Sequence, residues 1–296
     1  MIPVISSKSS IFDLSAQHTP AYIASPGDTL LFETKDCFSS QITREDQRLE
    51  TLDWSCTNPA TGPVYVRDAM PGDVLKVSIL SIETGTFGVM AAIPKAGLFG
   101  DEVSESAIKV LPIENGQVTF RPGLSIPLQP MIGVIGVAPS VGAIGCGTPG
   151  SHGGNMDNRL IGTGSTLYLP VFHEGALLAM GDVHAAMGDG EVMVTGVETA
   201  ARITVRVEVM KGSPLNNPLL ETASHFYTIA SAKDLGTAVH TAARDMADLV
   251  MKCMNMPFHE AGMLLSACGH TEICQVVDPL QTARFSMPKS VLESVF

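Results

Sequence analysis

The middle of the chain contains Met131-Ile-Gly-Val-Ile-Gly-Val137, a nearly continuous apolar run. A short run of this kind, without polar alternation, is typical of a β-strand that is covered on both faces. From residue 84 to residue 130 the chain alternates short β-like runs with glycine and proline, which excludes long helices there. The sequence therefore predicts a β-rich body with residues 131–137 inside it.

Other segments of the first two hundred residues also predict strands. Pro-Gly-Asp occurs at residues 26–28 and again at 71–73, each time before a β-prone run. Proline fixes φ, glycine accepts a positive φ and aspartate caps the turn, so a turn followed by a strand is expected at both places. Residues 166–171 and 176–180 predict a hairpin, and residues 192–209 continue as β-structure, with period-two alternation from Arg202.

The last eighty residues change character. Apolar residues at helical spacing predict a helix from Leu235 to Cys253 after a capping segment at 231–234, and a second helix over 259–267. Residues 273–277 predict a strand. We therefore expect a mainly β (β-rich α+β) fold with a sandwich- or barrel-like body over residues 1–215 and a C-terminal α/β element over residues 216–296 that packs on it.

Composition narrows the class of protein. The chain has 296 residues, of which 16% are charged, and a net charge of −12 without a Lys/Arg cluster, so nucleic acid and anionic membranes are poor partners. No apolar run is long enough for a membrane span, and the first twenty residues lack a secretory signal. Six cysteines without a regular framework favour free thiols in the cytoplasm. The low charge and positive mean hydropathy also favour subunit contacts, so we expect a homodimer or a higher homo-oligomer.

After the apolar run, the segment from Gly145 to Val194 contains two short clusters of glycine, histidine, asparagine and acidic residues. Asp182 and His184 are two residues apart, so on a strand both side chains leave on one face. We expect a turn at residues 188–190, after which Glu191 begins a strand that runs back beside the first. An Asp, a His and a Glu on one face suit a divalent metal, with zinc first and calcium or manganese as alternatives. The alternative is a hydrogen-bonded core histidine with acids in turns.

A glycine-rich loop precedes these residues. Gly153 and Gly154 let the backbone approach a substrate and expose N–H groups. Amide hydrolysis needs such donors because negative charge develops on the carbonyl oxygen. Asn155 is the candidate donor, and Asp157 is the candidate to orient His152 or to bind metal. The alternative is a tight turn without a catalytic role.

Two further features leave alternatives open. Glu33 and Asp36 follow the first predicted strand and could reach a cation or a polar substrate, or they could belong to a solvated loop that Asp36 caps. Cys146 lies in the glycine-rich loop and invites a thiolate mechanism, but no base is adjacent in the sequence, and a small buried cysteine is the commoner case.

Several segments together resemble the acetamidase/formamidase family. They are residues 32–36, 130–139, 153–159, 164–171, 181–192 and 275–279. The resemblance implies a β-rich enzyme that cleaves short aliphatic amides to a carboxylate and ammonia with a divalent metal. By matched position it implies Asp36, Asp182 and His184 as metal ligands, and Asn155, Asp157 and Glu191 as residues that line the reaction. Met187 stands where the family pattern implies a polar residue, often glutamine.

We therefore expect a cytoplasmic hydrolase of short linear amides in which a bound metal lowers the pKa of water toward about 7. Glu191 would take the proton and pass it to the departing nitrogen, while the metal and Asn155 stabilise the oxyanion. Two rival hypotheses remain at this stage. One is a metal-stabilised β protein that binds a small molecule without turnover, and the other is a hydrolase that depends on Cys146.

Overall fold

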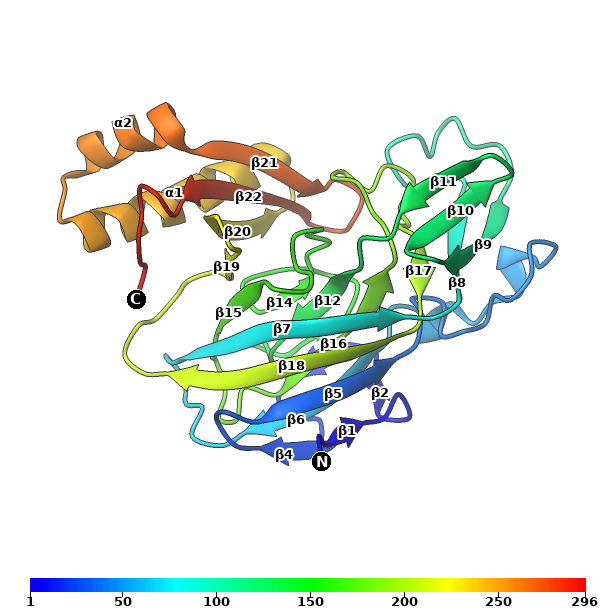
Figure 1. Cartoon of the computed structure of the whole chain (residues 1–296), viewed down its shortest axis with the longest axis horizontal. Helices are drawn as coiled ribbons and strands as arrows, with labels where there is room; N and C mark the ends of the chain where they lie inside the picture. Colours follow the sequence, from blue (N-terminus) through cyan, green and yellow to red (C-terminus); the bar gives the residue numbers. More distant parts are fainter.

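A computed structural model describes all residues from Met1 to Phe296 and contains two large β-sheets and two α-helices (Figure 1). The nine-stranded sheet has the order β1 (Val4–Ile5), β5 (Thr29–Thr34), β18 (Ala201–Met210), β7 (Val74–Thr84), β15 (Thr166–Pro170), β19 (Leu219–Glu221), β20 (His225–Ala232), β22 (Gln281–Pro288) and β21 (His270–Gln275).

The second sheet has eleven strands. Its main path is β11 (Leu124–Pro127), β10 (Gln117–Arg121), β9 (Ala107–Glu114), β8 (Phe87–Ala92), β17 (Glu198–Thr199), β16 (Leu178–His184), β12 (Met131–Gly136) and β14 (Gly153–Asn155). In addition, β6 (Ala60–Val66) pairs with β16, with β2 (Ser10–Ile11) and with β4 (Tyr22–Ala24). A separate two-stranded sheet contains β13 (Ala143–Gly145) and β3 (Asp13–Ser15), and two short 3₁₀ helices span Leu49–Thr51 and Trp54–Cys56.

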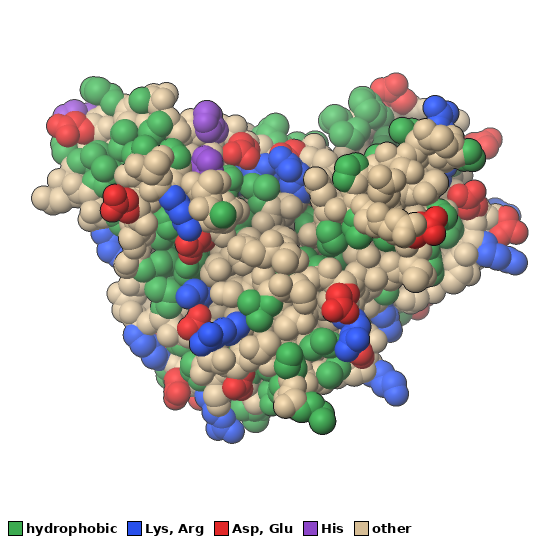
Figure 2. Space-filling model, viewed as in Figure 1, with side chains coloured by type: hydrophobic (Ala, Val, Ile, Leu, Met, Phe, Trp, Pro, Cys, Tyr) green, Lys and Arg blue, Asp and Glu red, His purple; other side chains and the backbone are tan.

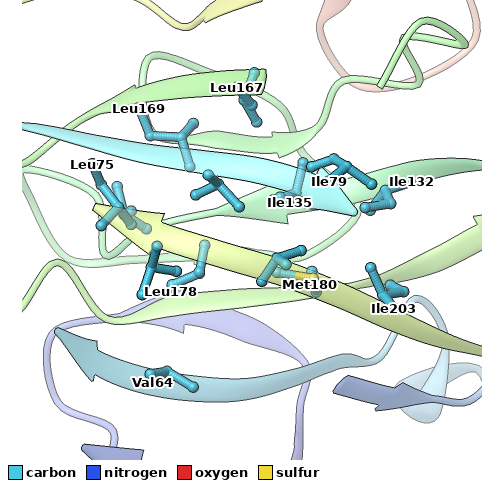
Figure 3. Packing of buried hydrophobic residues seen from close by; sticks show 14 of the residues in the cluster. Val64, Leu75, Ile79, Ile132, Ile135, Leu167, Leu169, Leu178, Met180 and Ile203 are labelled. Carbon is cyan, nitrogen blue, oxygen red and sulfur yellow. The ribbon is translucent and has the colours of Figure 1, made fainter. Parts of the chain in front are cut away.

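The main hydrophobic core lies between the two large sheets. Figure 3 shows side chains from both sheets in this core, among them Leu75 and Ile203 of the first sheet and Ile132 and Met180 of the second. All four side chains are fully buried. Burial of apolar surface on facing sheets is what holds such layers together, and it stabilises them by roughly 25 cal/mol per Å² of apolar surface. The mainly β, sandwich-like fold predicted from the sequence is therefore confirmed.

The apolar run from Met131 forms β12 as predicted, and every residue of that strand is buried. It lies between β16 and β14, with both neighbours antiparallel to it. The two Pro-Gly-Asp turns also behave as predicted, because Asp28 accepts a hydrogen bond from the N–H of Ser25 and Asp73 accepts one from the N–H of Met70. β5 and β7 begin directly after these turns.

The C-terminal element contains both helices. α1 (Leu235–Met254) begins after Asp234, whose carboxylate accepts a hydrogen bond from the N–H of Thr237, and α2 (Phe258–Cys268) ends at Gly269. The apolar side of α1 covers β20 and β22 (Figure 1). The nine-stranded sheet runs through the body and into this element, because β19 pairs with β15. The division into a body over residues 1–215 and an element over residues 216–296 stays a prediction.

Two predicted hairpins are wrong. β15 and β16 belong to different sheets, so residues 171–177 cross between the layers instead of forming a hairpin. Glu191 does not begin a strand, since the chain from Ala185 to Val197 is a loop with left-handed backbone at Glu191 (φ 46°) and Val194 (φ 67°). β15 and β16 are buried on both faces, and alternation cannot reveal which partner such strands have.

Charged side chains of both signs are interspersed on the surface (Figure 2). The same view shows a hollow between the C-terminal element and the part of the second sheet that contains β9, β10 and β11. Neither helix has the length and apolar character that crossing a membrane requires.

Candidate active site

The candidate site lies where four elements of the second sheet end or turn. β16 ends with His184, whose strand partner on β17 is Glu198. Asn155 is the last residue of β14, and Asp157 follows it. All of these side chains are buried although they are polar or charged. The pairing of β14 with β12, of β12 with β16 and of β16 with β17 therefore brings together Asn155 and Glu198, which are 43 positions apart in the sequence.

Carboxylates surround one nitrogen of His184. The Nε2 atom lies 3.1 Å from Glu198 Oε2, 3.6 Å from Asp182 Oδ1, 3.8 Å from Asp157 Oδ1 and 3.9 Å from Glu191 Oε1. Burial lowers the pKa of His184, but the negative charges of Glu198 and Asp182 outweigh it and raise that pKa well above its usual value. On its other side, His184 Nδ1 lies 3.3 Å from Met187 Sδ.

The acids themselves are held in an environment that disfavours their charged form. Burial, reinforced by the charge of Asp182, raises the pKa of Asp157 to about 7. Burial also raises the pKa of Glu198 to about 8, although His184 opposes the shift. The pKa of Glu191 and that of Asp278 are raised as well, first by burial and then by Asp157. Such groups need a positive charge or a proton beside them.

Several of these atoms are buried without a hydrogen-bond partner. They include both carboxylate oxygens of Asp157, Asp182 Oδ1, Glu198 Oε2 and His184 Nε2. Buried polar atoms normally find partners because leaving them unpaired costs free energy. Metal-ligating atoms lie within 4.8 Å of one another in two groups, Asp157 with His184 and Glu191, and Cys37 with Asp182 and Glu198. These side chains could therefore bind a metal ion.

The backbone is strained at three of the acids. Asp157 (φ 42°), Asp182 (φ 51°) and Glu191 (φ 46°) all lie in the left-handed region. Non-glycine residues are uncommon there, and each costs on the order of 1–3 kcal/mol. The left-handed conformation breaks the regular alternation of β16 at Asp182, opposite Gly133 on β12, and the site therefore lies at a distortion of the sheet.

Gly133 leaves the space that the acids occupy. A Cβ atom at this position would lie 2.5 Å from Asp157 Oδ1 and 2.7 Å from Asp182 Oδ2. We expect Gly133→Ala to displace both carboxylates and to weaken metal binding by about 10–100-fold, the range seen when groups that orient metal ligands are changed. Isothermal titration of the metal-free protein would measure this.

The matched control for this substitution is Gly145→Ala, because nothing lies within 4 Å of a Cβ atom there. Metal affinity should be unchanged in that variant. Equal affinities for Gly133→Ala and the unmodified protein would show that the two carboxylates do not hold the metal.

The glycine-rich loop contributes Asn155 to the site. Its Nδ2 donates a hydrogen bond to Asp278 Oδ2 at 2.9 Å, and its Oδ1 has no partner. A Cβ atom at Gly153 would lie 2.3 Å from the carbonyl oxygen of Ile135, and one at Gly154 would lie 2.4 Å from that of Thr148. Close backbone packing therefore requires both glycines, and their contact with substrate stays a prediction.

His152 is buried in the same loop but lies apart from the carboxylates around His184. Its Nε2 has no partner, and burial lowers its pKa to about 4, so the ring is neutral at pH 7. The ring packs against Gly150 and Gly154, since a Cβ atom at either position would lie 3.0 Å from one of its nitrogens. The predicted interaction of His152 with Asp157 has no counterpart among the contacts of the structure.

Glu33 and Asp36 have different positions. Asp36 is buried, and its Oδ1 accepts hydrogen bonds from the N–H groups of Phe38 and Ser40 at 2.9 Å each, which shapes the loop beside Asp182. Glu33 points away from the core because β5 alternates, and its Oε1 lies 3.9 Å from Arg202 Nε. Glu33 is therefore not among the residues that line the cavity beside Asp182, and its substrate-binding role stays a prediction.

Cys146 is buried outside the site. Its Sγ donates a weak hydrogen bond to the carbonyl oxygen of Ile11 at 3.7 Å, and burial raises its pKa to about 12. The side chain is thus a thiol at neutral pH and a poor nucleophile.

Three site residues were absent from the predicted set. Cys37 follows Asp36, Glu198 lies opposite His184, and Asp278 comes from the loop after β21. Together with Asn155, Asp182 and Glu191 they line a cavity of about 270 Å³. This volume admits a small organic molecule. Of these three residues, only Asp278 lies in a segment, residues 275–279, that the sequence analysis had singled out.

A buried arginine fixes the loop that carries Glu191. The Arg284 side chain, on β22, is fully buried and donates to Asp189 at 2.9 and 2.7 Å, to Glu272 at 2.8 Å and to Asn158 at 3.0 Å. The N–H of Gly190 also donates to the carbonyl oxygen of Cys274. The C-terminal element therefore positions the loop of Glu191 and also Asn158, which follows Asp157 in the chain.

Comparison with known proteins points to one family. The profile of the acetamidase/formamidase family matches residues 17–145 and 143–278. The fold is similar to that of an acetamidase from Bacillus halodurans (TM-score 0.97, 47% identity, 98% of each chain covered). It is also similar to a predicted acetamidase/formamidase from Thermoanaerobacter tengcongensis (TM-score 0.97, 49% identity, 100% of this chain and 98% of that one covered).

A curated relative is the acetamidase of Mycolicibacterium smegmatis, which is 25% identical over 253 residues, or 63% of this chain and 62% of the relative. The chain spans 60 to 62% of the length of the curated relatives that it matches.

Proposed function

This chain belongs to the acetamidase/formamidase family, and on that premise we propose that it hydrolyses the C–N bond of short linear amides to a carboxylate and ammonia. The observation that carries the proposal is the group of buried carboxylates around His184, four of whose oxygens lie within 3.9 Å of Nε2. Asp182, Glu191 and Glu198 of this group line a cavity that suits a small substrate.

We propose that Asp157, Asp182 and His184 hold a divalent cation. Each has a buried ligand atom without a hydrogen-bond partner, and a nitrogen and oxygen donor set suits zinc first and manganese or calcium next. When bound, such a cation lowers the pKa of a water molecule toward about 7 and thereby supplies a nucleophile at neutral pH. The predicted ligand Asp36 lies beside this group, but one of its oxygens already accepts two backbone hydrogen bonds.

Glu191 is the proposed proton carrier. Its carboxylate oxygens are not among the buried atoms that lack partners, and the residue lines the cavity. Burial and Asp157 raise its pKa well above the usual value, so the carboxylate can accept a proton from the attacking water and donate it to the departing nitrogen.

Asn155 is the proposed donor to the developing oxyanion. Asp278 holds its amide through the Nδ2 group, which retains a second N–H that can point into the cavity. A preorganised donor of this kind stabilises charge that appears only in the transition state. Asp278 would therefore act on the reaction through Asn155.

Ammonia release tests the proposal. Formamide and acetamide are incubated with the purified protein, with the protein after chelation and dialysis, and with the chelated protein after metal is restored. We expect release in the first case, loss of at least 90% of it in the second, and recovery in the third. A protein that binds metal but releases no ammonia from any linear amide is a binding protein, and release that survives chelation contradicts the role of the metal.

A further inference from the structure

We propose that a second divalent cation is bound by Cys37, Asp182 and Glu198, beside the cation at His184, with Asp182 as a ligand of both. The site would take a cation that accepts thiolate as well as oxygen, such as zinc or cobalt(II). This inference deepens the proposed function, since it takes the first cation site from there, but its test does not require turnover.

The geometry of the three residues carries the inference. One ligand atom from each lies within 4.8 Å of the others, which is the spacing expected around a single ion. The three come from different elements, namely the loop after β5, the distorted end of β16 and the short strand β17. They are 6%, 2% and 2% exposed, and Asp182 Oδ1 and Glu198 Oε2 lack hydrogen-bond partners.

Asp182 lies between the two sites. Its Oδ1 is 3.6 Å from His184 Nε2, while its carboxylate also belongs to the group with Cys37 and Glu198. A carboxylate has two oxygens and about four lone-pair sites, so it can bind two cations at once. The left-handed backbone at Asp182 turns the side chain into this shared position.

The number of acids in this region also favours a second cation. Five acids are buried together in this region, Asp36, Asp157, Asp182, Glu191 and Glu198, with Asp278 partly buried beside them, and His184 is the basic side chain among them. With one divalent cation, several of these acids have to stay protonated, which their raised pKa values allow. Buried charges without partners are costly, and a second divalent cation offsets two more of them.

Cys37 differs from the other buried cysteines. Its carbonyl oxygen accepts a hydrogen bond from the N–H of Asn58, and the neighbouring Asp36 holds the next residues through its side chain, so the backbone that carries the thiol is fixed. Burial and then the charge of Glu198 raise its pKa well above the usual value. A cation that binds there displaces the thiol proton to solvent and leaves a thiolate ligand. The cavity that Cys37, Asp182 and Glu198 line provides the access route.

Cobalt(II) titration of the full-length, metal-free protein tests the inference. Elemental analysis gives the number of ions per chain, and near-ultraviolet absorption reports thiolate-to-cobalt charge transfer. We expect two ions per chain with a charge-transfer band in the unmodified protein, one ion without the band in Cys37→Ser, and one ion in Glu198→Gln. Cys146→Ser is the matched control, a buried cysteine outside the site, and should keep both ions and the band.

One ion per chain in the unmodified protein, or a band that survives Cys37→Ser, would overturn the inference. Thermal melting of each metal-free variant identifies any that fails to fold, and Glu198→Gln then provides the test without altering a cysteine. Two ions with no ammonia release contradict the hydrolase but retain the second site. Ammonia release with one ion and no band contradicts only the second site.

Discussion

Replacing Glu191 with Gln is expected to lower kcat for acetamide by about 10²–10⁴-fold, the contribution typical of a positioned general acid or base. Glutamine preserves the shape of the side chain but cannot carry a proton between the attacking water and the departing nitrogen. The atoms proposed to bind the cation, on Asp157, Asp182 and His184, remain in place. Elemental analysis should therefore find the same metal content as in the unmodified enzyme, and steady-state kinetics should find the loss in kcat.

Glu33→Gln is the matched control for this prediction. Glu33 lies on the outer face of β5 and contacts Arg202, so the same change of chemistry there should leave kcat and KM unaltered. If Glu191→Gln keeps its turnover with its metal, another group carries the proton. If instead it loses its metal, Glu191 is a ligand of the cation, as its distance of 3.9 Å from His184 Nε2 also permits.

The largest effect on stability is expected at Arg284. Replacing it with Met leaves the carboxylates of Asp189 and Glu272 without their shared cation, in a place where the arginine side chain is fully buried. Loss of one partner of a fully buried ion pair typically costs about 3–5 kcal/mol. The carboxylates of Asp189 and Glu272 are 32% and 29% exposed, and Asp189 also lies 3.1 Å from Arg159, so we expect a smaller decrease of about 1–3 kcal/mol in the free energy of unfolding. Urea denaturation of the metal-free protein measures it without a contribution from bound metal.

Arg244→Met provides the comparison. Arg244 pairs with Asp248 one helical turn away, and both side chains are 47% exposed, so its loss should cost at most about 0.5 kcal/mol. Similar losses for the two variants would mean that the Arg284 pairs contribute no more than surface pairs. Because Arg284 also fixes the loop of Glu191, its variant should lose activity below the temperature at which it unfolds.

The elements that were predicted well have signals that are local. The carboxylate of Asp234 caps α1 by accepting a hydrogen bond from the N–H of Thr237, three positions later. In each Pro-Gly-Asp turn, the aspartate likewise bonds to a backbone N–H three positions earlier. The apolar run of β12 is long enough to indicate burial on both faces without knowledge of its partners. Local patterns of this kind gave the fold class, the helices and the interior strand.

Pairing between distant segments was not predictable in the same way. β15 and β16 follow each other along the chain, yet each pairs with strands from elsewhere, because apolar residues on both faces do not specify a partner. The site shows the same limit. Asp182 and His184 were found from their spacing on one strand, whereas Glu198 enters by cross-strand pairing and Cys37 by a loop that Asp36 shapes. The hairpin expected to carry Glu191 was wrong although the residue reaches His184.

The left-handed backbone at Asp157, Asp182 and Glu191 has a consequence for how this sequence can drift. Glycine adopts that conformation without steric cost, and at these positions it would also remove a buried carboxyl group. A gene copy released from selection for catalysis, but still selected for a folded product, should therefore replace these three acids early. Its descendants would be more heat-resistant than the enzyme and inert, so in this family stability can be gained by discarding the chemistry.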